Sequence, residues 1–223
     1  MGLAAVAHEG HPAHAKLGRM RHTPSYVMED PNEVKRLIRE NPWVTIVANT
    51  AKGMVASHYP VVVEEGRDDV SIVSHVGRPD DRLLELGTAE VLVIVQGPHG
   101  YVSSGWYDGV PAVPTWNHVT AHLYGTPEIL SDEENWRVLG ELVDHFEDHL
   151  PHPNRLSDNE EYGREIFSGT VGFRLVVTRF DARAKLSQNK TEKVVSNVID
   201  ELEHNAVYAQ PGLAAEMRKA HGR

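Results

Sequence analysis

The segment that decides the fold is PWVTIVANTAKGMVASHYPVVVEEGRDDVSIVSHV, residues 42–76. Runs rich in β-branched and aromatic residues alternate here with two short polar segments that favour turns, AKG and EGRDD. Such runs are typical of strands, and their short connections predict an antiparallel meander. The predicted strands cover residues 42–50, 54–64 and 70–76.

Helices and further strands are predicted on both sides of this segment. Asp30 and Pro31 are typical of an N-cap and a first helical turn, and Val34, Leu37 and Ile38 follow at helical spacing. Several short strands at this spacing favour an antiparallel barrel or sandwich with peripheral helices, an α+β fold. The other predicted helices cover residues 79–86, 132–150, 160–167, 193–202 and a segment after Pro211, and the other strands cover residues 89–96, 100–103, 119–130 and 170–180.

Length and composition favour one domain. The chain has 223 residues, 40% of them hydrophobic, and no linker long enough to divide it. We expect a disordered extension over residues 1–19, a domain over residues 20–205 and a tail over residues 206–223 that contains the helix predicted after Pro211. The extension has histidines at positions 8, 11 and 14, a short stretch that is weak evidence for a metal site. It lacks the apolar run of a signal peptide, so we expect a cytoplasmic protein.

Charge and cysteine content exclude several function classes. The formal net charge of −10 disfavours a protein that binds DNA by neutralising phosphates. There is no cysteine, and hence no disulfide framework or zinc–thiolate site. No apolar run approaches the ~20 residues that span a bilayer. No phosphate-binding P-loop, dinucleotide fingerprint or nucleophile elbow is present. His118 and His122 lie about 13 Å apart if they share a strand, which is too far for one metal ion.

Two segments carry residues suited to a ligand. The first segment, where a predicted strand meets a short helix, contains Ser74, His75, Arg78 and Arg82. The backbone amides at the start of the helix and the two guanidinium groups suit a phosphate or carboxylate ligand. The alternative is that these arginines pair with nearby acids. Residues 96–118 combine aromatic side chains with glycines and prolines, which indicates a constrained loop that lines a site for a planar ligand.

Short strings in these segments resemble the motifs of the PaiB family. The order and spacing of the strings agree from Met20 to about Leu202, and VPTWN and KLSQN are the most specific. The matching strings are MRHTP at 20–24, ASHYP at 56–60, SHVGR at 74–78, QGPHGYVSSGWY at 96–107, VPTWNH at 113–118, AHLYG at 121–125 and KLSQNK at 185–190.

The resemblance implies a split β-barrel similar to those of pyridoxamine-phosphate oxidases and flavin reductases. It implies a homodimer that holds FMN between its subunits, and a role as a negative transcriptional regulator. It also implies roles for residues of this chain: Ser57 and His58 facing the flavin, His75, Val76, Arg78 and Arg82 at the ring edge, ribityl chain or phosphate, Gln96 at the ring, Trp116 and Asn117 either from the partner subunit or closing the pocket, and Lys185, Gln188 and Asn189 on the substrate side.

The sequence departs from the family pattern at residues 79–81, where Pro79, Asp80 and Asp81 stand in place of Ala-Asn-Pro. Two carboxylates beside a phosphate site weaken phosphate binding by like-charge repulsion, which Arg82 can offset.

Three functions remain open at this point. The first is an FMN-binding regulator that acts indirectly, since direct DNA binding is doubtful. The second is an FMN-dependent oxidoreductase, in which His58 or Lys185 steers a substrate and a nicotinamide is the reductant. The third is a haem-binding split barrel. No resident metal is expected.

Overall fold

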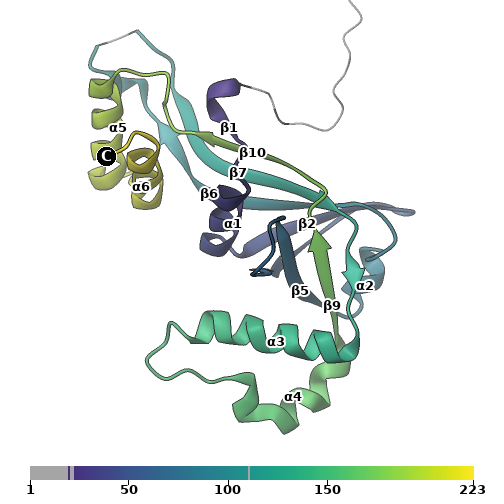
Figure 1. Cartoon of the computed structure of the whole chain (residues 1–223). Coiled ribbons are helices and arrows are strands. Elements are labelled where there is room, and N and C mark those ends of the chain that lie inside the picture. The colour runs from purple at the N-terminus through teal and green to yellow at the C-terminus, as the bar shows by residue number, and fades with distance from the viewer. Residues whose placement is uncertain (1–19, 21–22, 110) are drawn as a thin grey trace, which may run out of the picture.

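A computed structural model describes residue 20 and residues 23–109 and 111–223. Ten strands form two antiparallel sheets within this part of the chain, with six α-helices around them (Figure 1). The predicted α+β fold is confirmed. The extension over residues 1–19 lies outside the described residues.

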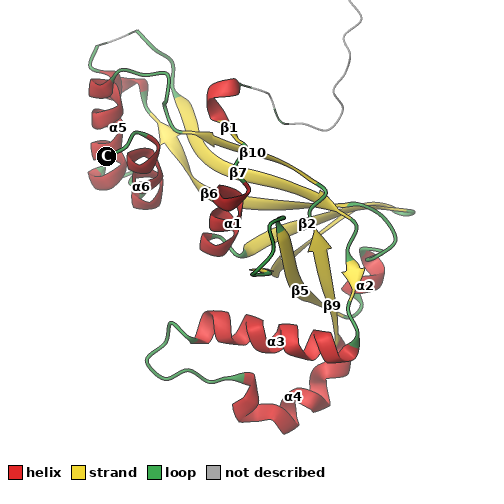
Figure 2. Cartoon of the chain, in the orientation of Figure 1, coloured by secondary structure: helices red, strands yellow, loops and turns green. Residues whose placement is uncertain are grey.

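The larger sheet has the strand order β1-β10-β7-β6-β2-β3, and the smaller sheet has the order β4-β5-β9-β8. Figure 2 shows the strands of both sheets in yellow and the helices in red. The strands of the larger sheet are β1 (Val27–Met28), β2 (Trp43–Thr50), β3 (Gly53–Pro60), β6 (Val91–Val102), β7 (Thr115–Gly125) and β10 (Arg179–Lys185). The strands of the smaller sheet are β4 (Val62–Val63), β5 (Ser71–Gly77), β8 (Glu128–Ile129) and β9 (Thr170–Val176).

The helices begin and end close to the predicted residues. Asp30 caps α1, where its carboxylate accepts a hydrogen bond of 2.9 Å from the Asn32 amide, and Val34, Leu37 and Ile38 enter the core as expected. The helices are α1 (Pro31–Glu40), α2 (Asp80–Leu83), α3 (Asp132–Glu147), α4 (Glu160–Ile166), α5 (Glu192–His204) and α6 (Pro211–Ala220). Leu213 and Met217 of α6 belong to the same core as the barrel, so the tail after residue 205 is packed against the domain.

The predicted meander is confirmed in its pairings but divided between two sheets, because its second strand, residues 54–64, is interrupted at Val61. β2 pairs with β3, but the chain then leaves the larger sheet at Val61, and β5 pairs with β4 and β9 in the smaller sheet. The strand predicted over residues 170–180 is likewise two strands, β9 and β10, which lie in different sheets. The break falls where the Thr178 amide donates to the Tyr124 carbonyl and the Val177 amide to the Val70 carbonyl. No glycine or proline marks this crossing, so local sequence gives no signal for it.

The strands predicted over residues 89–96 and 100–103 are one strand, β6. It continues through an irregularity in its pairing with β7 between Gln96 and His99. The two ends of the segment predicted as a constrained loop, residues 96–102 and 115–118, are therefore strand, and between them a short 3₁₀ helix, η2 (Ser104–Tyr107), precedes the loop that leads to β7.

Gly125 is a packing requirement at the end of β7. A Cβ added there would lie 2.6 Å from the Val176 carbonyl oxygen and 3.0 Å from Leu175 Cδ1. We expect Gly125→Ala to lower the free energy of unfolding by about 1–3 kcal/mol, because a β9 carbonyl cannot move aside. The matched control is Gly140→Ala in α3, which meets nothing within 4 Å and is expected to raise stability by about 0.5–1 kcal/mol. Urea unfolding measures both, and equal midpoints for the two variants would contradict the packing argument.

Candidate functional site

One group of predicted site residues gathers where β3, β5 and α2 meet. The carboxylate of Asp80 accepts hydrogen bonds from Ser57 Oγ at 2.7 Å and from Tyr59 Oη at 2.8 Å. Tyr59 Oη in turn accepts a bond of 3.2 Å from the Gly77 amide. Burial, followed by the hydrogen bond to Asp80, raises the pKa of Tyr59. Asp80 is thus a structural acceptor for β3 hydroxyls and not a free negative charge.

The two arginines of this group differ in their engagement. Arg78 Nη1 lies 3.0 Å from Asp81 Oδ2, and Arg78 Nε donates to the Ser168 carbonyl at 3.1 Å. The side chain of Arg82 is exposed, and within the described residues it has no carboxylate within ion-pair distance. Arg82 can therefore bind an anionic ligand directly, whereas Arg78 would first have to release Asp81.

His75 and Val76 follow one another on β5 but have different surroundings. His75 is partly buried, its Nδ1 has no hydrogen-bond partner, and burial lowers its pKa. The Val76 side chain is 0% exposed and belongs to the core, so only its backbone can contact a ligand. We refer to Ser57, His75, Arg78, Asp80 and Arg82 as the α2 group.

Ser57 and His58 point to opposite faces of the larger sheet, because successive residues of a strand alternate. Ser57 pairs with the buried Ile46 on the core side and bonds to Asp80. His58 is exposed on the other side, where its ring stacks on Trp43 with centroids 6.5 Å apart. The expected contact of both residues with the flavin therefore stays a prediction, in which at most one of the two side chains lies on any one face of the sheet.

A second group surrounds a cavity of about 320 Å³ at the other end of the larger sheet. The two most specific strings, VPTWN and KLSQN, meet here because they contribute to neighbouring strands β7 and β10 and the turns beside them. We call this cavity the motif pocket. Its lining residues are Tyr26, Tyr107, Pro111, Ala112, Val113, Thr115, Asn117, Lys185, Ser187, Asn189 and Lys190.

Asn117 and Gln188 have structural roles at this pocket. Asn117 is 0% exposed, and its Nδ2 donates to Ser187 Oγ at 2.9 Å, while its Oδ1 has no partner. Gln188 closes its own turn: its Oε1 accepts from the Leu186 amide at 2.8 Å and its Nε2 donates to the Ala184 carbonyl at 2.5 Å. The side chain of Gln188 is therefore engaged within the chain and does not line the pocket, which differs from its predicted ligand role.

Lys185 is held at the edge of the pocket. Its Nζ donates to Thr115 Oγ1 and, at 2.6 Å, to the Trp116 carbonyl. Burial lowers the pKa of Lys185, and the nearby charges of Arg183 and Lys190 lower it further. Sequence reasoning missed Ser187 and Lys190 as lining residues, although both lie within the quoted string at 185–190.

Exposed aromatic side chains continue from this pocket along β6 and β7. Trp116 is 55% exposed, and its ring contacts those of His99 and Tyr101 at centroid distances of 6.4 and 6.3 Å. Gln96 is exposed beside them, with its Nε2 3.3 Å from His99 Nε2. The exposed face of the Trp116 ring, with the Gln96 amide nearby, is thus available to a planar ligand.

A single chain does not bring the two groups together. Ser57 shares a row of the sheet with Ile46, Val93 and Leu123, whereas Asn117 lies further along β7. From the pairing, Asn117 is roughly 20 Å away along the strands and roughly 14 Å away across them. The predicted flavin-binding residues therefore fall into two separate groups within one chain.

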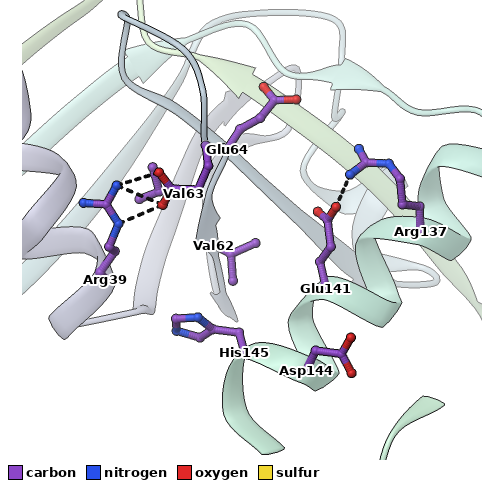
Figure 3. Close-up of a pocket in the computed structure, with 9 residues that line it drawn as sticks. Arg39, Val62, Val63, Glu64, Arg137, Glu141, Asp144 and His145 are labelled. Atoms are coloured by element: carbon purple, nitrogen blue, oxygen red, sulfur yellow. Dashed lines mark hydrogen bonds and ion pairs between the residues drawn. The ribbon is translucent and has the colours of Figure 1, made fainter. Parts of the chain in front are cut away.

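A larger cavity, about 560 Å³, lies elsewhere, between α1, β4 and α3 (Figure 3). Its two arginines pair with acidic residues of the same lining: Arg39 contacts Glu65 at 2.9 Å, and Arg137 contacts Glu141. None of the predicted site residues lines this cavity. Its charges are satisfied, so it is a weaker candidate than the smaller motif pocket.

Neither a metal centre nor a membrane segment emerges from the described residues. No cluster of three or more histidine, cysteine, aspartate or glutamate side chains is arranged to hold a metal ion among them. None of the helices in that same part of the chain is both long and apolar enough to cross a bilayer.

Three partly buried histidines make stability depend on pH. Burial is the main cause that lowers the pKa values of His75, His118 and His122. The unfolded chain then binds more protons than the native state once the pH falls below the ordinary histidine pKa of about 6.5. We expect the free energy of unfolding to fall as the pH is lowered from 7.5 to 5.5. Urea unfolding with His75→Gln should show a smaller fall than the unaltered protein, and an equal fall for the two proteins would contradict the role of His75.

The fold and the divided site define the class of protein, a flavin-binding split β-barrel. Solved neighbours with this fold include the FAD and heme binding protein from Mycobacterium smegmatis, 16% identical with a TM-score of 0.54 over 76% of this chain and 78% of that chain. The flavocytochrome Anf3 from Azotobacter vinelandii is 12% identical with a TM-score of 0.54 over 76% of this chain and 74% of that chain.

Residues 20–179 match the family described as "Putative FMN-binding domain". The chain is also 33% identical over 187 residues to "Protease synthase and sporulation protein PAI 2" of Bacillus subtilis (strain 168), which covers 81% of this chain and 88% of that protein. The chain belongs to the PaiB family. The expected family is thus confirmed, and FMN, the predicted cofactor, agrees with the family's description.

Proposed function

We propose that this protein binds FMN between two copies of the chain and serves as a flavin-responsive regulator. The observation that carries the proposal is the division of the site. The α2 group lies at one end of the larger sheet and the exposed Trp116 ring, beside the motif pocket, at the other, so a second copy is needed to complete one binding site.

The open face of the larger sheet supports a homodimer. Residues of this face alternate with core residues along β2, β6 and β7, yet none of them is fully buried, and several are apolar. A half-exposed apolar sheet face favours association with a partner. We call it the outer sheet face, formed by Thr45, Val47, Leu92, Ile94, Thr120, His122 and Tyr124.

The residues present fit FMN. Arg82 would bind the phosphate, the unpartnered Nδ1 of His75 and the exposed amide of Gln96 would bond to ring or ribityl atoms, and the Trp116 ring would exclude water from one side. FMN, when bound, supplies one- and two-electron redox chemistry, while the protein supplies placement.

A regulatory role rests on the Bacillus subtilis relative, whose name links it to protease synthesis and sporulation. The formal net charge of −10 disfavours direct contact with DNA, so we place the regulation downstream of the flavin's redox state and in the cytoplasm. A gel-shift titration at low and high salt tests this: a salt-sensitive shift by the protein alone would argue for direct binding.

A second candidate, an FMN-dependent oxidoreductase, is favoured by Lys185, a partly desolvated amine beside Trp116. Bleaching of the flavin absorbance by NADPH or NADH at a rate well above that of free FMN would support it.

The first experiment is an absorbance spectrum of the protein after incubation with FMN and desalting, with the mass from light scattering. We expect flavin bands near about 370 and 450 nm on a dimer. A colourless dimer would refute FMN binding, and a Soret band would instead indicate the haem alternative.

A further inference from the structure

The motif pocket lies in a local excess of positive charge. Most cations of the described chain pair with carboxylates, but Arg183, Lys185 and Lys190 have no carboxylate within ion-pair distance among those residues. The Lys190 Nζ instead lies 4.9 Å from the centroid of the Tyr107 ring. Three neighbouring cations without acidic partners, in a chain of net charge −10, favour an anionic ligand.

The base of the pocket is polar and buried. Asn117, Ser187 and Tyr107 are 0%, 4% and 2% exposed, and each lines the pocket. Two of their atoms, Asn117 Oδ1 and Tyr107 Oη, have no hydrogen-bond partner within the described chain. Buried polar atoms are normally satisfied, so a pair of them at one cavity indicates that a ligand or ordered solvent supplies the missing bonds.

The remaining walls are apolar or aromatic. Tyr26 and the Pro111–Val113 segment face the same space as the lysines. A volume of about 320 Å³ lies at the lower end of the ~300–1,000 Å³ typical of small-molecule sites. The cavity suits a compact molecule with one apolar side and one charged end.

We propose that the motif pocket binds a small amphiphilic anion, a carboxylate or phosphate distinct from FMN, through Lys185 and Lys190. Lys185 has a third N–H besides those given to Thr115 and Trp116, and Lys190 has no competing carboxylate. The Tyr26 and Tyr107 rings contact the apolar part. The inference goes beyond the proposed function, because it places a second ligand beside the half-site that Trp116 contributes.

The mutual repulsion of the cations supports this assignment. Burial lowers the pKa of His118, and Arg183 and Lys185 lower it further. Arg183 and Lys190 act on Lys185 in the same direction. An anion in the pocket would offset this repulsion and favour the charged forms.

The test is calorimetric titration of the full-length protein, with and without FMN, using benzoate and inorganic phosphate as probes and benzamide as the uncharged analogue. We expect benzoate to bind at least about tenfold more tightly than benzamide, and Lys190→Gln to weaken benzoate binding about tenfold. Lys52→Gln, which removes an equal charge from the exposed turn between β2 and β3, should leave the affinity unchanged.

The outcomes distinguish this pocket from the flavin's own phosphate site. If Lys190→Gln weakens FMN but not riboflavin, and benzoate does not bind to the FMN-loaded protein, the cations serve the FMN phosphate and the proposal is overturned. Equal binding of benzoate and benzamide would also overturn it. A protein that binds benzoate with the expected selectivity but never retains FMN would support the pocket and refute only the flavin proposal.

Discussion

Replacing Ile94 with lysine is expected to convert the protein from a dimer to a monomer and to abolish retention of FMN. Ile94 is a half-exposed residue at the centre of the outer sheet face, between Thr45 on β2 and His122 on β7. In the proposed dimer, each subunit would then place one unpaired lysine charge in the interface formed by the outer sheet face. We expect dimer affinity to fall by more than about 100-fold, because such charges carry desolvation penalties of several kcal/mol.

The matched control is Ile166→Lys, which places the same charge on an isoleucine of α4 that is 55% exposed and remote from the outer sheet face. It should remain a dimer and keep its flavin bands. Light scattering and absorbance measure both variants, and circular dichroism establishes that each is folded. A folded, dimeric Ile94→Lys protein would place the dimer interface on another surface and would contradict the proposed arrangement.

Arg82→Ala is expected to weaken FMN binding by about 10- to 100-fold and to leave riboflavin binding unchanged. The two ligands differ only in the phosphate, and a hydrogen bond to a charged group contributes about 1.5–3 kcal/mol. Arg82 is the exposed cation of the α2 group without an ion-pair partner in the described chain, so its loss disturbs no internal contact that the structure records. Fluorescence quenching of each flavin on titration with protein measures the two affinities.

Arg78→Ala provides the comparison within the same group. Arg78 already contacts Asp81 and the Ser168 carbonyl, so we expect a smaller loss of FMN affinity than for Arg82→Ala. Arg137→Ala, on the exposed side of α3, is the remote control and should bind both flavins normally. An equal loss of FMN and riboflavin affinity for Arg82→Ala would mean that the residue supports the fold of the α2 region and does not bind the phosphate.

Elements with strong local signals were predictable. The Asp30 cap and the Val34, Leu37 and Ile38 face placed α1 within one residue of its observed bounds. The hairpin of β2 and β3 followed from β-branched runs around a glycine turn. Contacts between distant segments were not predictable. Nothing near Val177 indicates that the chain changes sheets there, because the backbone hydrogen bonds that separate β9 from β10 are made to residues 70 and 124.

The candidate site divides in the same way. The sequence by itself determined the family, the flavin class of ligand and the presence of VPTWN and KLSQN, because these depend on residue identity and order. Only the tertiary structure decided which of these side chains are exposed and unpaired enough to contact a ligand. It buried Val76, engaged Gln188 in its own turn, and put Ser57 and His58 on opposite faces. The physical reason is that burial, strand alternation and hydrogen-bond pairing depend on neighbours that are distant in sequence.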